Sequence, residues 1–540
     1  MPNDNQTDAF LALADPSVRE HFEVLLRRGS GSWAGMQQAF LDMIDEYVDA
    51  ERAKPIEDHI ETHEAGGQWR IAFPHHAARG DDRIAERLRE TMAARKGYQD
   101  GRLHHGFSDC AEVHHEIETF LYFQIPLFYS GLPGSEVALE SIVDVAHHLG
   151  NWVDGIPSWY DWETHGFRST WLGTREVRDF PPHDYQEANH FRFVNLAIAA
   201  HVGTEDRRYL DLATDYADRW CGHIEDLAGR GEPIRCSILP EEAAAGEMGF
   251  GGKRRDDDKD YKVFYSTVSA NTAYDVATAL MDLWRVTGTE RYLDAARAMI
   301  DQFFDHGADG RPAVRYKDGE WQTESPTDDE VRRFMGNMQS SCMIARPALR
   351  HDMITGTDRY RQHILDWARV IDEESNRPDQ MMADVLVAAH YHDGDEAWLE
   401  RAYAMAVRVA AVLETDDGFH QCSASSRQGS KFLMPLLYQP LLGGMDWGTR
   451  GNLPLLRLKH ESGKGVGLPP SVAFRTWRTD GSALSFTARN AGDQAAAWQV
   501  HSAKRNGRAI HVEMPGETGR PDADITLDPG AETTGRITFS

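Results

Sequence analysis

A short turn motif occurs four times in this chain. Each copy has a glycine, then Thr or Asp, then acidic and basic residues, and then an aromatic residue that leads into an apolar segment. The copies are VGTEDRRYL from Val202, TGTERYL from Thr287, TGTDRYR from Thr355 and HDGDEAWL from His392. Glycine in the left-handed conformation ends one helix, and Thr or Asp caps the next. One copy would fit any helical protein, but four copies predict an array of helical hairpins.

Apolar residues at helical spacing predict six paired segments. The pairs are 8–28 with 32–52, 110–130 with 135–152, 187–202 with 206–224, 267–287 with 290–306, 338–354 with 358–374, and 379–392 with 396–414. The first pair departs from the others, because its turn is RRGSGSW.

Connections within the predicted hairpins are a few residues long, whereas connections between hairpins are long. The long connections cover 53–109, 153–186, 225–266 and 307–337. In an array of antiparallel hairpins, all connections between hairpins emerge at the same end. We therefore expect that end to carry the functional site, because long loops in a compact domain are usually functional or disordered.

The pattern changes after about residue 415. The segments SVAFRTWRTDGSALSFTARNAGDQAAAWQVHSAKRNGRAIHVEM and DITLDPGAETTGRITFS alternate apolar with polar residues and contain DG, NG and PG turns. Such segments are typical of antiparallel strands. We predict an N-terminal hairpin with its long loop over 1–100, the main helical body over 101–415, a connecting segment over 416–467 and a β domain over 468–540.

Composition narrows the class of protein. With 41% hydrophobic residues and a mean hydropathy of -0.54, the chain is predicted to be soluble and globular. It has no apolar run of the roughly 18 residues that cross a membrane. Its start lacks a basic region and an apolar stretch, so we expect a cytoplasmic protein. The five cysteines show no CxxC spacing, and the net charge of -29 argues against nucleic acid as a partner.

Six helical hairpins, TGTERYL-type turns and a β-rich C-terminal part together resemble the (α/α)6 toroid superfamily. Its members are largely glycoside hydrolases and polysaccharide lyases, with some sugar epimerases. The resemblance implies a mainly α fold, an (α/α)6 toroid with a C-terminal antiparallel β-sandwich-like domain. It also implies an enzyme that acts on an oligosaccharide or polysaccharide. No single family's catalytic residues can be matched, so candidates must come from the chemistry of the loops.

The richest loop is NWVDGIPSWYDWETHGFRSTWLG, from Asn151 to Gly173. A sugar ring stacks its C–H face on aromatic rings while its hydroxyl groups bind polar side chains, and this loop offers both. Asp161 is a candidate catalytic carboxylate here. The candidate substrate-binding residues are Trp152, Trp159, Trp162, His165, Arg168 and Trp171. The alternative is an aromatic loop that packs on neighbouring helices.

A second segment, HHGFSDCAEVHHEIETFLYF, gathers histidines and carboxylates. On a helix that starts near Asp109, the side chains of Glu112, His115 and Glu116 share a face. Glu116 is the catalytic candidate here. The group could also hold a divalent metal through imidazole and carboxylate, but no HExxH motif appears, so no metal ligand is assigned and the cofactor is left open. The alternative is capping by Asp109 next to a solvated helix face.

Two further segments supply candidates. FPPHDYQEANHFRFVN begins the third hairpin and contributes the catalytic candidates Tyr185, Glu187 and His190. A helix N-terminus there would suit an anionic sugar, although Glu187 could simply cap the helix. GGKRRDDDKDYKVFYSTVSANTAYD contributes Tyr265 as a catalytic candidate, with Arg254 and Asn271 as binding candidates. The alternative for its charged run is a solvated loop.

Two mechanisms compete. Hydrolysis needs two carboxylates that flank the scissile bond, and it is favoured narrowly. Elimination from a uronic acid needs a Tyr or His base and a group that neutralises the substrate carboxylate. A noncatalytic sugar-binding protein is the third possibility. The predicted partner in each case is an oligosaccharide or polysaccharide, with one that contains uronic acid as a candidate.

Overall fold

The computed structural model describes most of the helical body and the strands of the C-terminal part, and the described residues are given by number. They are 45, 48–49, 52–60, 82–180, 186–231, 234, 237–238, 270–304, 313–317, 320–324, 342–355, 357–370, 380–395, 397–398, 400–402, 451–453, 456–460, 472–480, 483–490, 494–502, 510–514 and 522–539. Among them, no helix is long and apolar enough to cross a membrane.

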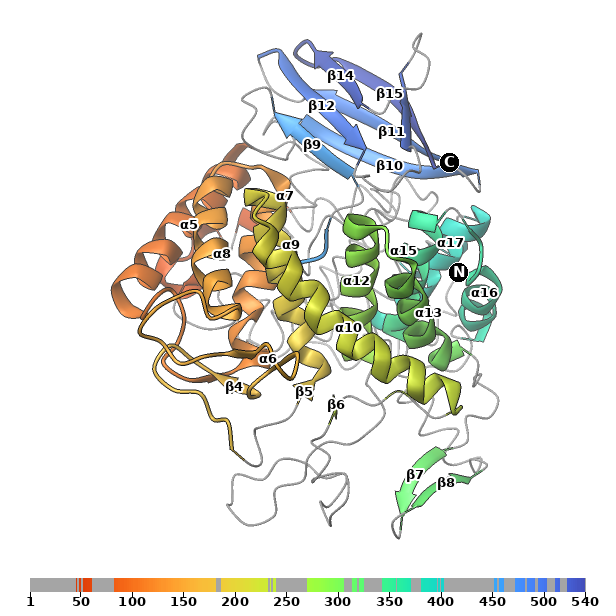
Figure 1. The fold of residues 1–540 in the computed structure, drawn as a ribbon. Helices are drawn as coiled ribbons and strands as arrows, with labels where there is room; N and C mark the ends of the chain where they lie inside the picture. Colours follow the sequence, from red (N-terminus) through yellow and green to blue (C-terminus); the bar gives the residue numbers. More distant parts are fainter. Residues whose placement is uncertain are drawn as a thin grey trace, which may run out of the picture.

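Antiparallel helix pairs form the body of the molecule, as predicted (Figure 1). The pairs are α7 (Ile125–Ser130) with α8 (Ser135–Leu149), α9 (Phe191–Thr204) with α10 (Arg207–Gly229), α12 (Ala270–Thr287) with α13 (Glu290–Phe304), and α15 (Ala345–Thr355) with α16 (Arg361–Val370). Helix α17 (Gln380–Asp393) begins the next pair, and helical residues at 397–398 and 400–402 follow it. The predicted segment 8–28 lies outside the described residues. The mainly α hairpin toroid is thus confirmed.

The helices divide into an inner and an outer set. Described side chains are buried around the whole circumference of α9, α12, α15 and α17, whereas α10, α13 and α16 bury one face only. A helix that is apolar on all sides lies in a core, and one with a single apolar stripe covers it. The inner helices therefore surround the axis of the barrel.

The prediction of a loop over 53–109 was wrong in its second half, which contains helix α5 (Asp82–Arg102). This helix packs on α8 and buries Ile84, Leu88, Met92 and Gln99 at helical spacing. Its apolar stripe is narrow and is surrounded by charged residues and glycines, so the sequence pattern hides it. Before the first α7 residue, the chain forms β1 (Ala111–Glu112), α6 (Val113–Glu116) and a π-helical turn, η3 (Phe120–Gln124).

The repeated turns are structural, and their hydrogen bonds explain their sequence. In the second copy, Thr287 Oγ1 donates to Leu283 O at 2.7 Å and accepts from Thr289 N at 3.2 Å, while Gly288 has φ 80°. In the fourth copy, Asp393 Oδ1 accepts from Asp395 N at 2.9 Å, and Gly394 has φ 78°.

In the first copy, the turn lies two residues after Gly203, the glycine at which the motif predicted it. Glu205, with φ 60°, takes the left-handed position, and Asp206 caps α10 by accepting from Arg208 N at 3.0 Å. Gly203 lies inside α9 instead. A Cβ there would come within 2.3 Å of Leu139 and 3.0 Å of Phe128, so this glycine serves close packing rather than a turn.

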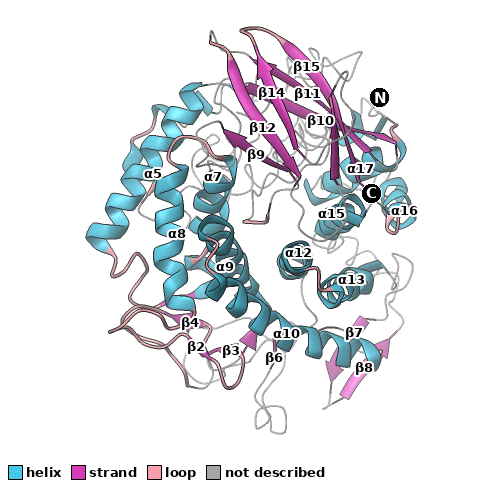
Figure 2. Ribbon diagram, turned by 45° about the horizontal axis from the view of Figure 1, so that its top comes forward, coloured by secondary structure: helices cyan, strands magenta, loops and turns pink. Residues whose placement is uncertain are grey.

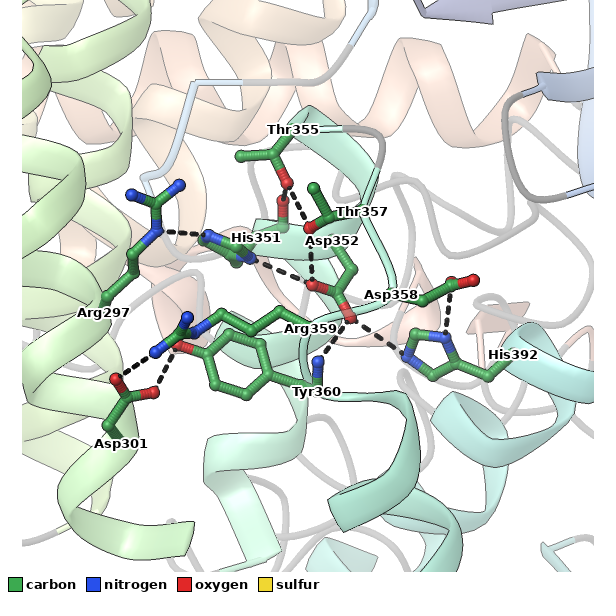
Figure 3. A network of polar contacts seen from close by, with 10 residues as sticks. All are labelled: Arg297, Asp301, His351, Asp352, Thr355, Thr357, Asp358, Arg359, Tyr360 and His392. Atoms are coloured by element: carbon green, nitrogen blue, oxygen red, sulfur yellow. Dashed lines mark hydrogen bonds and ion pairs between the residues drawn. The ribbon is translucent and has the colours of Figure 1, made fainter. Parts of the chain in front are cut away.

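Figure 3 shows how the third copy joins successive hairpins. Asp352, at the end of α15, accepts from Tyr360 N at 2.9 Å and from Thr357 Oγ1 at 3.2 Å. The following Arg359 and Tyr360 side chains reach Asp301 of the preceding hairpin, at 2.6 and 2.8 Å. The Arg-Tyr pair of the motif therefore stabilises the contact between neighbouring hairpins.

The two ends of the barrel differ as predicted. Short strands in the connections between hairpins lie together at the lower end in Figure 1, away from the C-terminal strands. They are β4 (Trp171–Leu172), β5 (Gln186–Glu187), β6 (Ser237–Ile238), β7 (Ala313–Lys317) and β8 (Glu320–Glu324). The inner helices α9 and α12 begin at this end, so their first residues face the long connections.

The C-terminal part forms two antiparallel sheets at the opposite end of the helices (Figure 1). One sheet has the order β10 (Val472–Asp480), β11 (Ala483–Asn490), β15 (Glu532–Phe539), β13 (Ile510–Glu513). The other has the order β14 (Asp522–Leu527), β12 (Ala496–Ser502), β9 (Leu456–His460). Strand β9 precedes residue 468, so part of the segment predicted as a connection belongs to the sheets.

The chain just before β9 inserts between the inner helices. Asn452 and Leu453 are buried, and Leu453 N donates to Asp282 Oδ2 of α12 at 2.7 Å. Arg285 and Arg350 each donate to Leu453 O at 2.7 Å, and Arg350 also contacts Asp282. Gly451, with φ 79°, brings this strap close to Leu121.

Candidate functional site

Four buried polar side chains meet where three elements of the barrel wall come together. Arg192, at the start of α9, is 1% exposed, and its Nε lies 3.2 Å from Asp275 Oδ2 at the start of α12. Its Nη1 lies 3.3 Å from Glu118 Oε1, just before the π-helical turn η3. Tyr122 of that turn donates to Glu118 Oε1 at 3.4 Å. We call Glu118, Tyr122, Arg192 and Asp275 the barrel cluster.

Burying the charged groups of the barrel cluster costs free energy that apolar packing alone does not recover. Removing a carboxylate or guanidinium from water costs several kcal/mol, which the ion pair repays only in good geometry. Burial lowers the pKa of Arg192, but Tyr122, Asp275 and Glu118 outweigh it, so the pKa rises above its ordinary value and the guanidinium stays charged. A π-helical turn beside such a group is itself a feature frequent at functional sites.

A second ion pair occupies the matching position on the next inner helices. Arg346, the second residue of α15, binds Asp384 near the start of α17 through two bonds, at 2.7 and 3.0 Å. Both pairs lie within the first two turns of inner helices, at the end that carries the long connections. The described part of this end therefore concentrates buried charge around the barrel axis.

The barrel cluster holds two buried carboxylates on one guanidinium. Because Glu118 and Asp275 contact the same guanidinium, their nearest oxygens lie within roughly 9 Å of each other. This upper limit is compatible with the carboxyl separation of retaining glycoside hydrolases (~5 Å) and with that of inverting ones (~6.5–9.5 Å). The guanidinium and the Tyr122 hydroxyl are hydrogen-bond donors of the cluster, and both bind Glu118.

His190 and Glu187 hold the backbone at the entry to α9. His190 is fully buried, its Nδ1 accepts from Glu187 N at 3.1 Å, and its Nε2 lies 2.9 Å from Ser169 O. Glu187 closes a capping box around this 3-10 turn and also accepts from Asn189 at 2.8 Å. Burial lowers the pKa of His190 to about 4, so the ring is neutral. Catalysis by either residue stays a prediction that would require these contacts to break.

The tryptophans of the second connection differ in exposure. Trp159 is buried and donates to Gly173 O at 2.9 Å, so it leaves no ring face for a sugar. Trp152 and Trp171 are half-buried, with Arg208 5.2 Å from the first ring and Arg178 4.4 Å from the second. Trp162 is 40% exposed.

The polar candidates of this connection lie apart from the barrel cluster. Asp161 Oδ1 accepts from Glu163 N at 2.9 Å. Burial raises the pKa of Asp161, but hydrogen bonds from Glu163 and Thr164 bring it below its ordinary value, which is the wrong direction for a general acid. Exposed His165 binds Asp215 at 2.8 Å, and exposed Arg168 binds Asp179 at 3.2 Å.

Of the remaining predicted site residues, the structure places Glu116 and Asn271. Glu116 Oε1 accepts from Ser108 Oγ at 2.6 Å, at the end of the short helix α6. Asn271 lies in the first turn of α12, four residues before Asp275. Tyr185, Arg254 and Tyr265 lie outside the described residues. Where His, Cys, Asp and Glu side chains are described, no three of them are grouped to hold a metal ion.

Sequence reasoning concentrated on the loops and missed Arg192 and Asp275. The available signal was a charge inside an apolar run: Arg192 in HFRFVNLAIAA, Asp275 in TAYDVATAL and Asp384 in MMADVLVAA. Such charges on a helix that is apolar on every side must be buried, and buried charges mark either ion pairs or functional sites.

Searches against family models and against curated proteins find no match. Solved structures give low-similarity matches. Cellobiose 2-epimerase from Spirochaeta thermophila DSM 6192 is 14% identical, with a TM-score of 0.42 over 65% of this chain and 97% of that one. GH127 beta-L-arabinofuranosidase from Geobacillus stearothermophilus T6 is 12% identical, with a TM-score of 0.35 over 92% and 80%. Cellobiose 2-epimerase from Bacillus thermoamylovorans B4167 is 12% identical, with a TM-score of 0.32 over 63% and 90%.

Proposed function

We propose that this chain is a carbohydrate-active enzyme that cleaves glycosidic bonds in an oligosaccharide or polysaccharide. The observation that carries the proposal is the barrel cluster, in which Glu118 and Asp275 flank one guanidinium at the end of the barrel that carries the long connections. Hydrolysis requires two carboxylates at such a separation, one as acid and one as base or nucleophile.

In this proposal Arg192 holds the substrate and sets the charge of the two carboxylates. A hydroxyl-rich ligand that draws the guanidinium away from one carboxylate would raise the pKa of that group, because it would lose a neighbouring positive charge. The freed carboxyl group would then donate a proton to the leaving oxygen, and the other would act on the sugar or on water.

Elimination from a uronate is the second candidate, and one observation favours it. Tyr122 lies beside Glu118, which contacts Arg192, so a phenol and a guanidinium occur in one cluster. The guanidinium would neutralise the substrate carboxylate while Tyr122, as the phenolate, removes the C5 proton. The C4–C5 double bond would then form as the C4–O bond breaks, and the phenol would give that proton to the leaving oxygen.

Incubation with neutral and uronate-containing oligosaccharides tests the proposal. Hydrolysis would release new reducing ends with no conjugated double bond, whereas elimination would create that double bond and its ultraviolet absorbance. Elimination would overturn the first candidate and support the second. Conversion to an isomer of the same length, or binding without turnover, would overturn both.

A further inference from the structure

The connection between β2 (Tyr160–Asp161) and β3 (Gly166–Phe167) projects from the outer wall of the barrel. It consists of Trp162, Glu163, Thr164 and His165, all of them exposed, and we call it the hairpin tip. Of the described residues, only Trp162 and Phe180 are exposed large hydrophobic side chains.

The hairpin tip is fixed to the outer helix α10 by three contacts. Asp215 binds His165 Nδ1 at 2.8 Å through one oxygen and accepts from Tyr160 Oη at 2.7 Å through the other. Arg219 donates to Thr164 O at 2.6 Å. Figure 2 shows β2 and β3 beside α10.

The indole of Trp162 is held in place while remaining accessible. Its ring meets Tyr160 edge-on at 5.0 Å and 73°, and it lies 6.4 Å from the ring of Trp152. Its Nε1 donates to Gly150 O at 3.4 Å. A preorganised aromatic surface loses little freedom when a ligand stacks on it, which favours binding.

His165 adds a strained polar group to this surface. Its φ of 56° is in the left-handed region, which is uncommon for a residue other than glycine. Such strain persists only where other contacts enforce it, and it concentrates at functional sites. Asp215 holds Nδ1 at 2.8 Å while the His165 side chain stays 55% exposed.

We propose that the hairpin tip is a second carbohydrate site, which binds a pyranose unit of a neutral oligosaccharide by stacking on Trp162 and hydrogen bonding to Glu163 and His165. A neutral sugar is favoured because the carboxylates of Asp161, Glu163 and Asp215 outnumber the guanidinium groups beside them. These belong to Arg219, which donates to Thr164 O, and to Arg168, which lowers the pKa of Asp161, in a chain of net charge -29. The inference shares with the proposed function only the assumption that the ligand is a carbohydrate.

Carbene footprinting with mass spectrometry locates such a ligand directly. The probes are cellohexaose, maltohexaose, xylohexaose and mannohexaose, with hexagalacturonate as the charged comparison. At least one neutral probe should protect the peptide that contains residues 160–167 and should bind saturably by calorimetry. Protection by none of the four, or tighter binding of hexagalacturonate, would overturn the proposal.

Matched variants distinguish ring stacking on Trp162 from the effect of removing any exposed aromatic side chain. Trp162→Ala should weaken binding at this site at least 10-fold, whereas Trp162→Phe should retain most of it, because it keeps a flat ring. Phe180→Ala removes an exposed aromatic outside the hairpin tip and should leave the affinity unchanged. Equal affinity in wild type and Trp162→Ala would refute the site.

The outcomes also distinguish the two proposals. Turnover without protection of the hairpin tip would reject this site and leave the proposed function standing. Protection without turnover would reject the proposed function and leave this site standing.

Discussion

The backbone N–H of Leu453 donates to Asp282 Oδ2 at 2.7 Å, which joins the strap before the β sheets to the middle of an inner helix. Burial raises the pKa of Asp282 above its ordinary value, although Arg350 and Arg285 oppose that rise. This contact places a buried carboxylate at the junction between the helical barrel and the C-terminal part.

Replacement of Asp282 should therefore destabilise the protein strongly. Asp282→Leu would deprive Arg285, Arg350 and Leu453 N of this carboxylate, at an expected cost of about 3–5 kcal/mol in the free energy of unfolding. Urea denaturation measures it. Asp294→Ala, which breaks an exposed pair with Arg297, should change the same quantity by less than about 0.5 kcal/mol. Equal stability of the two variants would contradict the role of the strap.

The shifted turn predicts a stabilising substitution. Glu205 has φ 60°, a conformation that costs an ordinary residue energy and glycine almost none. Glu205→Gly should raise the free energy of unfolding by about 0.5–1 kcal/mol. Gly203→Ala, in the same motif, should give no comparable gain, because the new Cβ would meet the side-chain ends of Leu139 and Phe128, which offsets the higher helix propensity of alanine. Thermal unfolding of both variants tests the position of the turn. A lower stability of Glu205→Gly together with a higher stability of Gly203→Ala would refute it.

Two buried histidines predict acid sensitivity. Burial lowers the pKa of both His190 and His148 to about 4, against 6.5 when unfolded. Between these values the unfolded chain binds more protons, so stability is complete above pH 6.5 and falls as the pH drops towards 4, by up to about 3 kcal/mol for each residue. Unfolding curves at several pH values measure this. His190→Phe should lower stability at neutral pH but flatten the dependence, and an unchanged slope would contradict the assignment.

The barrel cluster predicts which carboxylates matter for turnover. Glu118→Gln and Asp275→Asn should each reduce the rate at least about 100-fold if they act as acid and base. Glu187→Gln is the matched test, because Glu187 is bound in its capping box at the entry to α9. A catalytic role of Glu187 requires a similar loss in Glu187→Gln, whereas near-normal activity of that variant supports the barrel cluster as the active site. A large loss there with normal activity of Asp275→Asn would move the active site to the loop.

The turn motif predicted the hairpins because its effect is local. Thr287, Gly288 and Thr289 bond with one another and with the preceding turn, so the sequence of a few residues fixes the structure. Helix α5 escaped prediction because Ile84, Leu88 and Met92 form a narrow stripe among charges, and only packing on α8 distinguishes it from a loop. The aromatic-rich connection does lie between α8 and α9, as predicted, whereas its sugar binding stays a prediction. The exposure that distinguishes Trp162 from Trp159 could not be read from composition.

The sequence by itself determined the hairpin array, the end at which the long connections emerge and the β-rich C-terminal part. These depend on periodicity and turn chemistry within short windows. Only the tertiary structure decided that Glu118, Arg192 and Asp275 meet, since they come from three elements whose separation in space no local pattern encodes. It also decided that Gly203 serves packing and that Glu205 makes the turn, because the neighbours of Gly203, Leu139 and Phe128, come from the preceding hairpin.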